Sequence, residues 1–167
     1  NKVAQEENLV AINIVHRQAQ VEQLKKMGAT IVLNSSDADF EIQLKNVYAQ
    51  YKTEIILDAV GGTFCDVLLK DAPDGSTLVS YASLSKSMIE IHPIPIIRYG
   101  KKLEGFHLAY YMQSRGMLKL LRFTKKAQTL IYKGTLGCHI AHRFTLNTIN
   151  EAIDNYTKNM SEGKSIL

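Results

Sequence analysis

The feature that most constrains the fold is a repeated alternation between short apolar runs and segments with helical spacing. The apolar, β-rich runs are residues 9–15 (LVAINIV), 30–33 (TIVL), 54–57 (EIIL) and 76–81 (STLVSY). Such runs suit strands that are buried on both faces of a sheet. Residues 18–27, 40–48 and 63–70 lie between them, and their apolar side chains recur mostly three or four positions apart, which is typical of helices. The alternation predicts right-handed βαβ units and an α/β fold with a doubly wound parallel sheet.

The later part of the chain departs from this rhythm. Two prolines exclude residues 91–97 from a central strand and favour an extended loop that leads into a short helix. The remaining predicted elements are a strand over 102–108, a helix over 117–132, loop and strand over 134–144, a helix over 146–159 capped by Thr145 or Asn147, and a strand over 164–167. On the helix over 117–132 we expect Leu118, Leu121, Ala127, Leu130 and Ile131 to face the core.

Composition narrows the functional classes. A length of 167 residues corresponds to one domain or a large piece of one, and a net charge of +4 favours no partner by itself. Two cysteines fit a reducing compartment better than a disulfide-stapled secreted fold. No apolar run reaches the roughly 18 residues that a membrane span needs. We therefore expect an intracellular protein, of the cytoplasm or the mitochondrion, that does not span a membrane.

The start of the chain suggests that the sheet lacks its first strand. Residues 1–9 resemble the last turns of a helix, without an initiator Met or a signal pattern. No G-x-G-x-x-G occurs, and in a dinucleotide-binding fold it would lie directly upstream of Asn1. Without that central strand its two neighbours would expose open edges. The hypothesis is that the sequence is incomplete, or that a second polypeptide supplies the strand, and that the isolated chain is insoluble or molten.

Candidate binding residues follow the strands, because open parallel sheets bind ligands beyond their carboxyl ends. These residues are His16 and Arg17, the turn 58–61, and the turn 81–83. In dinucleotide-binding folds an acidic residue at the position of Arg17 would hold the ribose hydroxyls of NAD. A basic residue there favours the 2′-phosphate of NADP. The alternative is that Arg17 is a solvated residue in the first turn of the next helix.

Other features carry less functional weight. Gly61-Gly62 fits a close approach to a ligand and a plain strand-to-helix turn about equally well, and Asp58 is more typical of a helix cap than of a catalytic acid. Cys138, His139 and His142 lack the spacing of a zinc site, so we expect no metal. Cys65 lies among apolar residues and suits packing. The basic doublets are scattered over several elements, which argues against nucleic acid binding.

Eight segments along the chain form a recognisable series: residues 14–17 (IVHR), 20–29 (QVEQLKKMGA), 32–34 (VLN), 57–62 (LDAVGG), 78–81 (LVSY), 103–108 (LEGFHL), 150–153 (NEAI) and 161–164 (SEGK). Their order resembles the later half of a zinc-free medium-chain dehydrogenase/reductase, close to quinone oxidoreductases and mitochondrial enoyl thioester reductases. Each segment is moderately specific, and their order and spacing make the resemblance strong across the whole chain.

The resemblance implies a Rossmann-type cofactor domain over residues 1–135, and a segment over 136–167 whose strands rejoin an absent catalytic domain. It places NADP against these residues: His16, Arg17, Asp58, Ala59, Val60, Gly61, Tyr81, Ala82, Ser83, Phe106, Leu108 and Lys164. Ala82-Ser83 departs from the family, in which Gly-Gly is usual, and leaves less room for the cofactor. The catalytic residues would belong to the absent half.

The implied activity is hydride transfer from NADPH to an α,β-unsaturated carbonyl or a quinone, without zinc. The alternative is a catalytically silent, reductase-like subunit that binds NADPH or supports a larger assembly. The expected partners are a small-molecule substrate and a second copy of the chain, paired edge to edge along residues 102–108.

Overall fold

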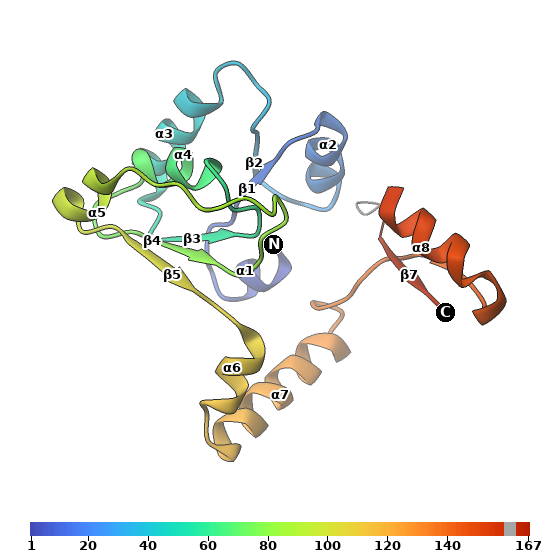
Figure 1. Cartoon of the computed structure of the whole chain (residues 1–167). Helices are drawn as coiled ribbons and strands as arrows, with labels where there is room; N and C mark the ends of the chain where they lie inside the picture. Colours follow the sequence, from blue (N-terminus) through green and yellow to red (C-terminus); the bar gives the residue numbers. More distant parts are fainter. Residues whose placement is uncertain (159–162) are drawn as a thin grey trace. The chain divides into compact units, whose positions relative to one another are not determined.

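The computed structural model describes residues 1–158 and 163–167 (Figure 1). The chain forms two compact units, residues 3–116 and residues 117–167. The functional boundary expected after residue 135 stays a prediction.

The first unit alternates strands and helices as the sequence predicts. Its elements are α1 (Lys2–Glu6), β1 (Ile12–Val15), α2 (Gln18–Lys26), β2 (Ile31–Asn34), α3 (Phe40–Tyr51), β3 (Ile55–Asp58), α4 (Phe64–Lys70), β4 (Thr77–Ser80), α5 (Pro93–Tyr99), β5 (Lys102–Gly105) and α6 (Leu108–Gln113). Helix α2 ends where Gly28 adopts a left-handed φ of 87°, the position at which glycine commonly terminates a helix.

Paired strands of this unit all run parallel. β1 pairs with β2, with Ile12 opposite Ile31, and β3, β4 and β5 form a second sheet in that order. These pairings confirm the predicted α/β class with parallel strands. Among the described residues β1 and β3 belong to separate sheets, and the break falls where the predicted sheet lacks its first strand.

One apolar core joins the two sheets. Its buried residues are Leu33, Phe40, Leu44, Tyr48, Ile56, Cys65, Leu68, Leu69, Ala72 and Leu78. They come from β2, α3, β3, α4 and β4, so α3 and α4 contribute to a core that both sheets share (Figure 1). The Tyr48 hydroxyl donates a hydrogen bond to the Leu68 carbonyl at 2.9 Å, which links α3 to α4.

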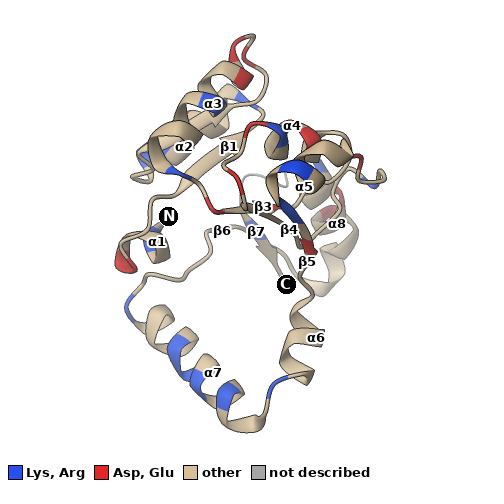
Figure 2. Cartoon of the chain, turned by 90° about the vertical axis from the view of Figure 1, so that its left-hand side faces the viewer, with Lys and Arg blue, Asp and Glu red and all other residues tan. Residues whose placement is uncertain are grey.

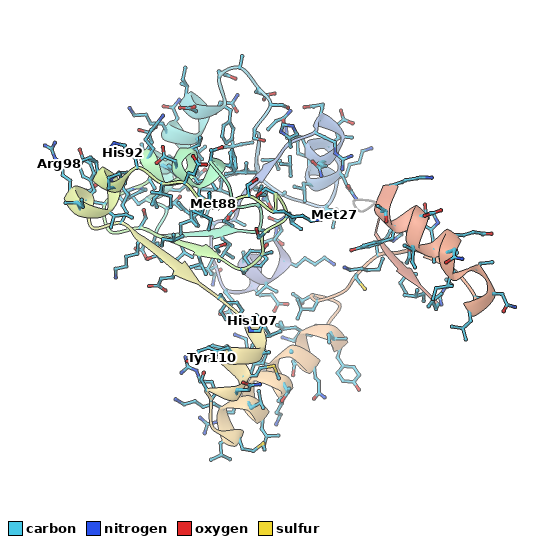
Figure 3. The ribbon with its side chains drawn as sticks, viewed as in Figure 1. Met27, Met88, His92, Arg98, His107 and Tyr110 are labelled. Atoms are coloured by element: carbon cyan, nitrogen blue, oxygen red, sulfur yellow. The ribbon has the colours of Figure 1, made fainter. Side chains whose placement is uncertain are left out.

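Two elements after β4 differ from the prediction at their boundaries. Pro93 and Pro95 lie in the first turn of helix α5, where backbone N–H groups have no partner within the helix, so the prolines are tolerated. The strand predicted over 102–108 ends at Gly105, and α6 begins at Leu108. His92 and His107, both labelled in Figure 3, cap these two helices through Nδ1.

The second unit is smaller. It contains α7 (Met117–Tyr132), β6 (Ile140–Arg143), the 3-10 turn η1 (Leu146–Thr148), α8 (Ile149–Lys158) and β7 (Lys164–Ile166), with β6 parallel to β7. Thr145 is the N-cap of η1, and Asn159 lies outside the described residues.

The structure corrects the prediction that one side of α7 faces the core. The helix has the predicted bounds and contains no buried residue, and Leu118, Leu121 and Ile131 are all exposed. Ala127 and Leu130, which were expected on the same side, are half-buried.

Candidate functional site

The first part of the candidate site lies at the end of β1. His16 and Arg17 are exposed, and Arg17 is the N-cap of α2 with an extended backbone. The Gln20 side-chain oxygen accepts hydrogen bonds from the backbone N–H of His16 at 3.3 Å and of Arg17 at 3.1 Å. The turn is therefore fixed by Gln20, and the Arg17 side chain points from a defined helix start.

Two serines at the end of β2 adjoin this turn. His16 Nδ1 lies 3.1 Å from Ser35 Oγ, and Ser36 Oγ lies 2.9 Å from the His16 carbonyl oxygen. The arrangement follows from the parallel register, which sets Val15 opposite Asn34, so the residues that come next share one edge. We name His16, Arg17, Ser35 and Ser36 the basic edge. It combines a cation with hydroxyl donors, which is the chemistry that recognises a phosphate.

The sequence analysis did not include these two serines among the candidate residues, although they follow the predicted strand over 30–33. A signal was available in the parallel pairing of the first two strands, which predicts that residues after both strands meet. Applying that rule to each strand end in turn would have added Ser35 and Ser36.

The second part of the site is the turn after β3, which Asp58 organises. This carboxylate is buried and accepts hydrogen bonds from the N–H groups of Val60 and Gly61, each at 3.0 Å. The Cys65 thiol also donates to it, at 3.4 Å. Burial first, and the Asp58 charge second, raise the pKa of Cys65 to about 11, so this thiol is protonated at neutral pH. Asp58 is thus committed to holding the turn.

Gly61 and Gly62 complete the turn with φ values of 75° and 74°. Residues other than glycine rarely adopt φ values in this left-handed region, so the backbone of the turn requires glycine. A β-carbon on Gly61 would lie 3.5 Å from Ser85 Oγ, which is ordinary contact, so conformation is the stronger constraint.

The structure brings this turn together with the predicted turn after β4. The N–H groups of Tyr81, Leu84 and Ser85 donate to the carbonyls of Asp58, Ala59 and Val60, each at 3.0 Å. Ala82 is half-buried, whereas Tyr81 and Ser83 are exposed. The segments 58–61 and 81–83, which the sequence analysis named separately, therefore form one hydrogen-bonded layer. We name this layer the paired turns.

Two further predicted residues follow β5 in the chain. Phe106 extends the pairing of β5, because its N–H donates to the Ser80 carbonyl at 2.9 Å, and its ring is 42% exposed. Leu108 is 51% exposed at the start of α6. Lys164 lies in β7 of the second unit, where its N–H donates to the His139 carbonyl at 2.8 Å. A contact between Lys164 and the first unit stays a prediction.

The described part of the chain consists of residues 1–158 and 163–167. These residues contain no group of three or more His, Cys, Asp and Glu that could hold a metal ion. No helix there is long and apolar enough to cross a bilayer.

Known proteins share both the sequence pattern and the fold. Residues 3–122 match the family model described as zinc-binding dehydrogenase. The human mitochondrial enoyl-[acyl-carrier-protein] reductase is 23% identical over 164 residues, which cover 95% of this chain and 44% of that protein.

Two solved structures extend the comparison. A putative NADPH:quinone reductase from Mesorhizobium loti superposes with a TM-score of 0.82 at 27% identity, over 99% of this chain and 47% of that one. The mitochondrial 2-enoyl thioester reductase Etr1p/Etr2p heterodimer from Candida tropicalis gives 0.78 at 17% identity, over 99% and 49% of the two chains.

These relatives are longer proteins, and the chain spans about half the length of each. The family match covers most of the sequence and includes both the basic edge and the paired turns. The chain is a member of the zinc-binding dehydrogenase family, one of the medium-chain dehydrogenases/reductases, and it corresponds to their Rossmann-like cofactor-binding half.

Proposed function

We propose that the chain is the cofactor-binding part of an NADPH-dependent oxidoreductase. The cofactor would supply a hydride, and the substrate would be an α,β-unsaturated carbonyl or a quinone that is reduced without zinc. The observation that carries the proposal is the basic edge, where Arg17 and the Ser35 hydroxyl replace the carboxylate that selects NAD.

The residues of the site fit such a dinucleotide. Arg17 and His16, with Ser35, would hold the 2′-phosphate through charge-assisted hydrogen bonds. The paired turns would lie along the rest of the cofactor, with Gly61 allowing close backbone approach. Phe106 and Leu108 would back the nicotinamide, and Lys164 would reach the cofactor from the second unit. The protein's part is to bind, orient and exclude water.

The similar proteins support the same class of reaction. The Mesorhizobium loti protein is described as a putative NADPH:quinone reductase, and the human protein is named mitochondrial enoyl-[acyl-carrier-protein] reductase. The proposal includes a homodimer, and the Candida tropicalis enzyme is likewise a dimer, formed by Etr1p and Etr2p. It also includes an intracellular location, in the cytoplasm or the mitochondrion.

A second candidate is a catalytically silent subunit that keeps the fold and the cofactor. Ala82-Ser83 favours it, because these side chains occupy the turn at which the family usually has Gly-Gly. The two candidates differ in turnover. A chain that binds NADPH and leaves it unoxidised in the presence of enoyl thioesters and quinones would support the silent subunit.

Cofactor preference tests the assignment of Arg17. Isothermal titration of the full-length protein with NADPH and NADH should give a tighter Kd for NADPH. Arg17→Ala should narrow that preference by about tenfold or more, because a hydrogen bond to a charged group contributes about 1.5–3 kcal/mol.

Arg98 provides the matched control, since it is another exposed arginine, on α5 (Figure 3). Arg98→Ala should leave the preference unchanged. Equal Kd values for the two cofactors in the parent chain would contradict the proposal.

A further inference from the structure

Gln20 holds the turn that carries the basic edge, and it does so with an uncharged side chain. It is half-buried at the third position of α2, and its Oε1 accepts hydrogen bonds from the backbone N–H groups of His16 at 3.3 Å and Arg17 at 3.1 Å. A glutamine or a glutamate at this position commonly bonds back to the residue that caps the helix. Gln20 is therefore the side chain that sets where the backbone of His16 and Arg17 lies.

Helix stability favours glutamate over glutamine at position 20. Both side chains reach the same N–H groups, and a carboxylate also interacts favourably with the positive end of the helix dipole. The first turn of α2 is uncharged from Gln18 to Val21, and the helix has its lysines in the last turn, among the blue segments of Figure 2. Capping alone therefore does not account for the neutral amide at position 20.

The place of the Gln20 oxygen indicates what a negative charge there would do. The oxygen lies within hydrogen-bond distance of both residues that give the basic edge its positive charge. A carboxylate at this place would attract the Arg17 guanidinium and repel a phosphate bound to it. Its effect would match that of the acidic residue that selects NAD at the end of this strand in dinucleotide-binding folds.

We propose that Gln20 is a specificity-determining residue of the cofactor site, because it caps α2 and adds no negative charge to the basic edge. The inference rests on the proposed function and extends it from the residues that would touch the 2′-phosphate to the one that positions them. Glutamine or glutamate at position 20 supports the fold, whereas only glutamine allows tight binding of NADPH.

Cofactor titration of the full-length protein tests the effect of charge. Gln20→Glu should raise the Kd for NADPH about tenfold, since like charges a few ångströms apart near a protein surface repel by about that factor. The Kd for NADH, which has no 2′-phosphate, should change by less than about threefold. The melting temperature should equal that of the parent protein or exceed it, because the carboxylate keeps the cap.

Two further variants separate charge from capping. Gln23→Glu adds the same charge at an exposed position, about one turn further along α2, and should change either Kd by less than about threefold. Gln20→Ala removes the cap and adds no charge. It should lower the melting temperature and keep more of the preference for NADPH than Gln20→Glu does.

The outcomes for the parent protein and for Gln20→Glu distinguish this inference from the proposed function. A parent protein with equal Kd values for the two cofactors would overturn the proposed function, and the inference with it. A parent that prefers NADPH, together with an equally stable Gln20→Glu variant that keeps the preference, would overturn the inference alone. A Gln20→Glu variant that melts well below the parent would also overturn it, because glutamate would then not replace glutamine in the cap.

Discussion

Asp58 accepts the hydrogen bonds that hold the turn after β3. Its carboxylate satisfies the N–H groups of Val60 and Gly61 and the Cys65 thiol, all in a buried setting. Asp58→Ala should lower the free energy of unfolding by about 2–4 kcal/mol, because two buried donors lose their acceptor.

Urea denaturation measures this loss, and Asp58→Asn provides the comparison. An amide of the same size keeps one acceptor oxygen, so its loss should be about half as large. Ser83→Ala, at an exposed neighbour in the paired turns, should change stability by less than about 0.5 kcal/mol. Equal stability of Asp58→Ala and the parent chain would show that the turn does not need its carboxylate.

For single residues, the sequence indicated candidate positions more readily than the part that each side chain plays. Position and residue type alone singled out Arg17, and its contact with a 2′-phosphate stays a prediction. Whether Asp58 binds a ligand or its own backbone depends on the path of residues 59–62, which local spacing leaves open. Ser35 and Ser36 belong to the candidate site because each contacts His16 at the end of β1, although helix α2 separates the two segments in the sequence.

Among the elements, α4 has an unusual C-terminal cap. Lys101 is 3% exposed, and its Nζ donates to the carbonyls of Leu69 at 2.9 Å and Lys70 at 2.8 Å. Burial lowers its pKa from 10.5, while Asp74 and Asp71 oppose that change. Lys101→Met should lower the free energy of unfolding by about 2–4 kcal/mol, since both carbonyls lose a donor. Lys102→Met, at the exposed neighbour, should have little effect.

The pH dependence of these two variants separates the cap from simple packing. The unfolded chain binds the Lys101 proton more tightly than the folded chain, so this group makes stability rise with pH between its lowered pKa and 10.5. Denaturation over that range should show the rise in Lys102→Met and lack it in Lys101→Met. Identical pH profiles would contradict the assignment of the cap.

The sequence predicted the type of each element, but for several elements it did not predict what covers them. Periodicity predicted α3 together with its buried Phe40, Leu44 and Tyr48, because that helix has a core to cover. The same pattern predicted α7 and misjudged its apolar side, since no spacing rule states which neighbour covers a helix. The doublet of Lys101 and Lys102 reads as solvated charge in sequence, and only the tertiary fold buries one member.

The whole first unit is held together by helices across a break between its sheets. β2, β3 and β4 each contribute to one core through α3 and α4, although β1 and β3 are in separate sheets among the described residues. The alternation of runs predicted parallel strands, and the lack of a G-x-G-x-x-G motif predicted the place of the break. Which strand edges stay open depends on backbone hydrogen bonds between segments that are far apart in the sequence. Side-chain patterns alone do not predict these edges.

The predicted dimer would form along the outer edge of β5. Lys102 and Phe106 donate their N–H groups to Ser76 and Ser80 of the β4 side, each at 2.9 Å, so the intervening N–H of Leu103 points away from β4. All four residues of β5 are exposed. Proline at position 103 removes an outward donor and leaves the bonds to β4 intact, which is where edge strands tolerate it.

Sedimentation velocity tests whether a second copy pairs there. The full-length protein should sediment as a dimer at micromolar concentration, and its Leu103→Pro variant as a monomer with nearly unchanged stability, because only the intermolecular ladder is broken. Leu103→Ala should remain a dimer, which separates the lost donor from the lost side chain. Glu104→Pro should instead destabilise the fold, since that N–H faces β4. A Leu103→Pro variant that still sediments as a dimer would place the interface elsewhere on the molecule.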